Sequence, residues 1–91
     1  MRIKILGKFW ELVFKPLRKD DGYCYPPESP RKQIQIDSRL KGQRKLEVLI
    51  HEMLHAADWH KDEDAWIVPV SHDIAKVLWK VGYRSSMDAD D

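Results

Sequence analysis

Two histidines and a glutamate, His51, Glu52 and His55, form the pattern H-E-x-x-H in a segment whose apolar spacing is that of a helix. Residues four positions apart lie on the same helical face with Cβ atoms roughly 5–6 Å apart, so both imidazoles can reach one Zn²⁺. Glu52 follows the first histidine and is then placed to accept a proton from a water on the metal. The pattern predicts a zinc site with Glu52 as general base.

A catalytic zinc usually takes three protein ligands and keeps a position for water, so a third ligand is needed. Asp58 is disfavoured because a residue on the histidine helix cannot easily approach from the third tetrahedral direction. Glu63 precedes Ile67 and Val70 by four and seven positions, which puts it on the inward stripe of the next predicted helix. We expect Glu63 to be the ligand; the spacing leaves open Asp62, Asp64 and His60.

The chemistry expected of such a site is amide hydrolysis. Zinc lowers the pKa of its water toward about 7, Glu52 removes the proton, and the hydroxide attacks a carbonyl that the metal polarises. A tetrahedral oxyanion would need a further donor. The neutral candidates are Tyr23, Tyr25, His72 and Tyr83. If the predicted strand 33–37 is a sheet edge, an extended peptide could pair with it across the ion.

The elements that must position these groups are indicated by the apolar periodicity. Residues 3–14 alternate around Gly7 and predict a bent strand or a strand pair, and 33–37 alternates as a strand. The proline-rich stretch 15–32 predicts a loop with room for a short extended piece at 23–25.

Two helices are predicted after the strands, at about 43–59 and 62–81. Gly82 stands where a C-terminal cap is expected, and Pro69 either bends the second helix or marks where its regular part begins. The expected core stripes are Leu46, Leu49, Ile50, Met53, Leu54 and Ala57 in the first helix, and Ile67, Val70, Ile74, Val77, Leu78 and Val81 in the second.

Composition limits the possible partners. With 91 residues, 43% of them hydrophobic, we expect one domain over 1–84 and a flexible acidic tail at 85–91. Sixteen basic and fifteen acidic residues argue against a nucleic-acid partner. No apolar stretch approaches the roughly 20 residues that span a bilayer, so we expect no membrane partner and a cytoplasmic protein. Cys24, the sole cysteine, is expected to be a packed or loop thiol.

Residues 49–56, together with the acidic 62–64 that open the second helix, resemble the zincin-type metallopeptidases, specifically the small gluzincin-like (minigluzincin) group. The chain is also similar to small bacterial and phage proteins in which Gly-x-Cys-x-Pro-Pro precedes an Ile-x-Ile strand. The matching residues here are Gly22, Cys24, Pro26, Pro27, Ile34 and Ile36. This resemblance covers most of the chain, although the long insertion and separate substrate domain of the large gluzincins are missing.

What the resemblance implies is a zincin-like α+β fold, with a small sheet packed on an active-site helix and a glutamate helix. It also implies zinc at His51, His55 and Glu63, with Glu52 as base. We therefore expect a zinc-dependent metallopeptidase acting on a peptide or protein substrate. The alternatives are a catalytically silent zinc-binding protein of the same fold with a regulatory or interaction role, and an interaction module without metal. Oligomeric state is not determined by the sequence.

Overall fold

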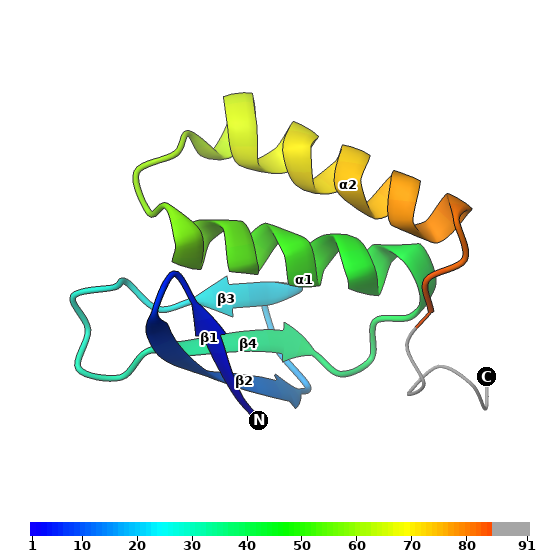
Figure 1. The fold of residues 1–91 in the computed structure, drawn as a ribbon. Helices are drawn as coiled ribbons and strands as arrows, with labels where there is room; N and C mark the ends of the chain where they lie inside the picture. The colour runs from blue at the N-terminus through cyan, green and yellow to red at the C-terminus, as the bar shows by residue number, and fades with distance from the viewer. Residues whose placement is uncertain (85–91) are drawn as a thin grey trace.

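A four-stranded sheet and two helices make up the computed structural model, which describes residues 1–84; the tail predicted at 85–91 lies outside the described residues. Helix α1 lies on the sheet and α2 lies on the opposite side of α1 (Figure 1). The elements are β1 (Arg2–Ile5), β2 (Lys8–Lys15), β3 (Gly22–Cys24), β4 (Gln33–Asp37), α1 (Gly42–Ala57), a π-helical turn η1 (Glu63–Ile67) and α2 (Val68–Lys80). The predicted α+β class is confirmed at this level.

The first two strands form an antiparallel hairpin, which confirms a strand pair broken at Gly7. Ile5 pairs with Lys8, so the turn holds two residues, Leu6 at φ 48° and Gly7 at φ 80°. Positive φ at both positions is the requirement of the type I′ turn, whose twist matches that of the flanking strands. The hairpin brings Trp10, which is 1% exposed, into the core beside Leu12.

Strand β4 lies inside the sheet, because the strand order is β1-β2-β4-β3. It runs parallel to β2 and antiparallel to β3, and both Ile34 and Ile36 are fully buried. The suggestion that 33–37 offers an edge to a peptide is therefore wrong. Alternation reveals one buried face of a strand but not its neighbours, and the three-residue β3 takes the edge position beside the site.

Helix α1 has two covered faces, one against the sheet and one against α2. Lys45, Val48 and Glu52 are buried, with Val48 in the core cluster under the sheet. Met53, predicted to be in the core, is 37% exposed. The helix ends at Ala57 rather than near residue 59, because Asp58 adopts an extended backbone.

The second predicted helix is divided, and its buried stripe differs from the prediction. A π-turn over 63–67 precedes the α-helix, with the N–H groups of both Trp66 and Ile67 bonded to the carbonyl of Asp62. The π-turn holds more residues per turn than an α-helix, so the phase of the following residues shifts. The buried positions are Ile67, Ser71 and Ala75. The predicted stripe residues Ile74, Val77 and Val81 are exposed.

The ends of α2 agree with the sequence expectation. Pro69 occupies the first turn, so it marks where the regular helix begins. At the C-terminus Gly82 has φ 99°. Its N–H donates to the carbonyl oxygen of Trp79, and the N–H of Tyr83 donates to the carbonyl oxygen of Leu78. This pair of bonds is a Schellman cap. Within residues 1–84 no helix has the length and apolar content to cross a membrane.

Candidate metal centre

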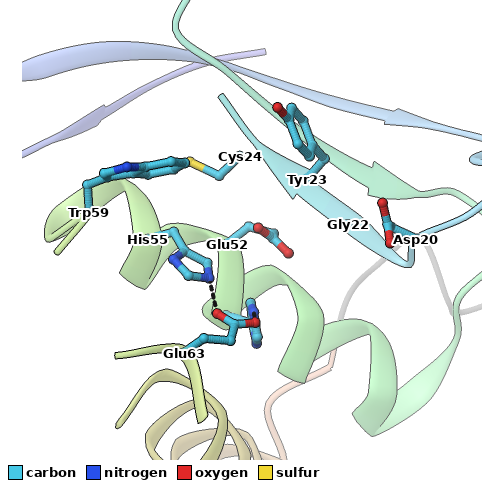
Figure 2. Close-up of a pocket in the computed structure, with 9 residues that line it drawn as sticks. Asp20, Gly22, Tyr23, Cys24, Glu52, His55, Trp59 and Glu63 are labelled. Atoms are coloured by element: carbon cyan, nitrogen blue, oxygen red, sulfur yellow. Dashed lines mark ion pairs between the residues drawn. The ribbon is translucent and has the colours of Figure 1, made fainter. Parts of the chain in front are cut away.

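The carboxylate of Glu63 contacts both histidines of the H-E-x-x-H pattern. Its Oε1 lies 2.9 Å from Nε2 of His51, and its Oε2 lies 2.5 Å from Nε2 of His55. Figure 2 shows Glu63 pointing from the start of the second helical segment toward His55 on α1. The structure thus brings the three predicted ligands into one cluster, and their role in binding metal stays a prediction.

The chemistry of the donor set fits zinc, and the three side chains lie close together. With metal–ligand bonds of 2.0–2.1 Å, the donor atoms of a tetrahedral site lie about 3.3 Å apart. The two nitrogen–oxygen distances here are 2.9 and 2.5 Å and involve different oxygens of the carboxylate, while one ring nitrogen of His51 and one of His55 lie within 4.8 Å of each other. An ion between the histidines would therefore require the carboxylate to withdraw and present one oxygen. Half of the Glu63 side chain is exposed, which leaves it room to move. Two imidazoles and one carboxylate are a ligand set found in catalytic zinc enzymes.

Glu63 reaches the histidines because of the way the chain turns into η1. The Asp62 carboxylate accepts a hydrogen bond of 2.6 Å from the N–H of Ala65 and so caps the turn. The π-turn that follows places buried Ile67 against α1, one turn after Glu63. Asp62 therefore positions the segment instead of supplying the ligand.

Glu52 lies beside the two histidines and is more buried than they are. One carboxylate oxygen of Glu52 and one ring nitrogen of each histidine all lie within 4.8 Å of one another, so these three residues also form a group that could hold a metal ion. Glu52 is 7% exposed and lies on the sheet-facing side of α1, and no hydrogen-bond partner for its carboxylate is found within residues 1–84. Burial raises the pKa of Glu52 to about 7, assisted by the negative charges of Glu63 and Asp20. A carboxyl with a pKa near neutrality can both accept and return a proton at physiological pH.

Gly22 of β3 covers this carboxyl directly. A Cβ at this position would lie 2.8 Å from Cγ1 of Val48 and 2.9 Å from Cγ of Glu52. Contacts this short are not tolerated between real side chains, so any larger residue would displace the strand or the glutamate. Gly22 lets the sheet edge approach the carboxyl closely.

Two cavities that share part of their lining open at the cluster, with volumes of about 260 and 200 Å³. The residues that line both are Asp20, Gly22, His51, Glu52 and Glu63. The larger cavity continues to Tyr23, Cys24, His55 and Trp59. The smaller one continues to Asp21, Arg44, Glu47 and Val48. The site therefore lies between an aromatic arm and a charged arm.

The other candidates from the sequence are placed as follows. Of the four possible oxyanion donors, only Tyr23 lines these cavities. His72 is instead bonded through Nδ1 to Glu47 at 2.8 Å, and Tyr83 is exposed beyond the end of α2. Neither His60 nor Asp64 lines either cavity. Cys24 is buried, and burial raises the pKa of its thiol to about 12, as expected of a packed thiol.

Three residues of the site were missed in the sequence. Asp20 and Gly22 belong to the predicted loop 15–32, and Arg44 lies near the start of the first predicted helix. Gly22 carried a signal, since it opens the Gly-x-Cys-x-Pro-Pro stretch. Nothing in the local pattern marks Asp20, because it reaches the site only through the return of the chain at β3. Arg44 lies on α1 with the histidines, and its place beside the site depends on its pairing with Asp21 from that returning segment.

Comparison of the chain with protein-family models, with curated proteins and with solved structures finds no match.

Proposed function

We propose that this protein is a zinc-dependent metallopeptidase of zincin-like architecture. The observation that carries the proposal is the Glu63 carboxylate, which contacts the Nε2 atoms of both His51 and His55 from a separate helical segment. A buried carboxyl with a pKa of about 7, Glu52, opens into the same cavities. Ligands and base are the separate parts that metal-assisted hydrolysis requires.

His51, His55 and Glu63 would hold the ion. When bound, Zn²⁺ acts as a Lewis acid that polarises a carbonyl and makes water a nucleophile at neutral pH. Glu52 takes the proton of the attacking water at its carboxylate and later returns it to the leaving amine. Its burial holds its pKa near the working pH, and its place in the lining of both cavities leaves the carboxyl accessible to the attacking water.

The outer edge of β3, which pairs with no other strand within residues 1–84, supplies a place for an extended peptide. Tyr25 donates its N–H to Gln33, and Asp21 accepts from the N–H of Asp37, so these odd-numbered residues bond toward β4. In an antiparallel pair the alternate residues point the other way. The backbone groups of Gly22 and Cys24 therefore face the open edge, where a substrate strand could pair with them.

Tyr23 lines the larger cavity, but its phenol does not face the reacting groups. A side chain at Gly22 would point toward α1 and Glu52, so the side chain of the next residue, Tyr23, points to the other side of the strand. There its ring packs edge-on against Tyr25 with centroids 5.3 Å apart, and Figure 2 shows its hydroxyl directed away from Glu52 and His55. Tyr23 is therefore not proposed as the oxyanion donor.

The test compares zinc content with peptide cleavage in the same preparations. Wild type should bind one zinc per chain and cleave an unfolded-protein substrate, while His55→Ala should lose the stoichiometric zinc. Glu52→Gln should keep the zinc and lose about 10²–10⁴-fold in rate. Glu28→Gln, an exposed glutamate outside both cavities, is the matched control and should behave as wild type.

Two results would overturn the proposal. Zinc absent from wild type after supplementation would exclude the metal site. Zinc present in wild type, with no cleavage that depends on Glu52, would favour the catalytically silent zinc protein, whose metal serves stability alone.

A further inference from the structure

The carboxylate of Asp20 lies at the exposed rim of the two cavities. Asp20 lines both cavities and is exposed, and within residues 1–84 it has neither an ion pair nor a hydrogen bond from its side chain. Figure 2 shows Asp20 and Glu52 on either side of Gly22. Because glycine has no side chain, nothing at that position separates the two carboxylates.

The other charges of the same arm are already paired. Arg44 contacts Asp21 at 2.8 Å and Glu47 at 2.9 Å, and Glu47 also contacts His72 at 2.8 Å. The guanidinium is thus held by two carboxylates and does not offer a free positive charge to a ligand. Asp20 remains the carboxylate in this arm that is available for a cation.

Asp20 and Glu52 line the same two cavities. Glu52 is 7% exposed, and its carboxylate has no hydrogen-bond partner in the described part of the chain. A buried acceptor without a partner is costly unless a ligand or water satisfies it. The space between Asp20 and Glu52 is therefore suited to a group that carries positive charge and N–H donors.

We propose that the cleft selects peptides with a lysine or arginine side chain next to the bond that is cut, and that Asp20 binds this cation. The inference rests on the proposed peptidase function, because it assumes that a peptide lies along β3. A peptide paired with the edge at Gly22 passes Asp20 immediately beyond it. Asp20 is thereby a specificity-determining residue and takes no part in the proton transfer.

The size of the preference follows from the exposure of Asp20. An exposed ion pair is screened by water and salt, so a cationic side chain should improve affinity by about threefold to fivefold over a neutral one. The preference should shrink as ionic strength rises, because the Debye length falls from about 10 Å at 0.1 M to 3 Å at 1 M.

The experiment measures peptide affinity in the zinc-loaded Glu52→Gln protein, which leaves the peptide intact. Two fluorescein-labelled peptides that differ only in lysine or glutamine at one position are titrated and followed by fluorescence anisotropy. The lysine peptide should bind about threefold to fivefold more tightly. Adding Asp20→Asn should abolish the difference, Asp20→Glu should retain it, and Asp20→Lys should reverse it.

The matched control is Asp73→Asn, which removes the same charge from an exposed α2 position outside both cavities. It should leave the preference unchanged. Equal affinities in the parent, no binding of either peptide, or a preference that survives Asp20→Asn would overturn the proposal. Cleavage of both peptides by wild type at equal kcat/KM would also overturn it while leaving the peptidase function intact. A binding preference without cleavage would support the subsite and refute the enzyme.

Discussion

Replacing Glu52 with glutamine should stabilise the metal-free protein at neutral and alkaline pH. Glu52 is 7% exposed, and burial raises its pKa from 4.5 to about 7. Between those values the folded protein keeps this proton while the unfolded chain has released it. The unfolded state binds fewer protons, so the free energy of unfolding falls as pH rises from about 4.5 to about 7 and is then constant.

The magnitude follows from the same two pKa values. A difference of about 2.5 in pKa, at 1.36 kcal/mol for each unit, corresponds to about 3 kcal/mol of lost stability above pH 7. Glutamine has nearly the same shape and no charge, so it removes this cost. The variant should exceed wild type by about 3 kcal/mol at pH 8 and by almost nothing at pH 4.5. For a domain of this size such a gain is a large part of the total stability.

The assay is urea unfolding with a metal chelator present, followed at several pH values between 4.5 and 8. Glu28→Gln controls for the loss of one negative charge at an exposed position. Equal stability of Glu52→Gln and wild type at pH 8 would refute the reasoning, and so would a gain of the same size at every pH. The first result would mean that the carboxyl is solvated, and the second that glutamine makes a new contact.

Three further changes test the elements that position the site. Gly22→Ala should lower the free energy of unfolding by about 1–3 kcal/mol, because its Cβ would lie 2.8 Å from Val48. Urea unfolding midpoints measure this loss. If the losses caused by Gly22→Ala and Val48→Ala add in the double variant, the proposed contact is contradicted. Asp62→Ala should lower the free energy of unfolding by about 1 kcal/mol through loss of the cap, and should weaken zinc binding in a competition titration. Asp64→Ala removes a neighbouring carboxylate that does not cap the turn, and it should do neither. Asp37 has its pKa lowered to about 2 by the neighbouring arginine, so its contribution to stability is present above pH 3.8 and is lost as pH falls through about 2. Thermal melts should show that Asp37→Asn removes this acid-dependent loss, and an unchanged acid limb would contradict the pairing.

Local pattern was sufficient for several parts of the molecule. The spacing of His51 and His55 places both imidazoles on one helical face, and the alternation of 33–37 defines a strand with a buried face. Gly82 closes the second helix because a residue with positive φ is needed there. These features depend on contacts between residues a few positions apart, so the sequence pattern is enough to predict them.

Features that depend on distant segments required the three-dimensional structure. The sequence led to Glu63 through a stripe that continued to Val70, Val77 and Val81, yet the π-turn changes the phase and the small Ser71 and Ala75 are buried instead. Glu63 nevertheless meets the histidines, since it is the first residue of the π-turn and the phase shift affects the residues after it.

The position of a strand in a sheet is set by its partners and not by its own alternation. The sequence by itself determined the chemistry available on α1, because that chemistry needs only the helical repeat. Tertiary structure decided that β3 forms the rim, that Gly22 covers Glu52 and that Asp20 stands beside them. Pairing between β3 and β4 depends on loop closure and on packing over α1, and neither leaves a periodic signal in the residues concerned.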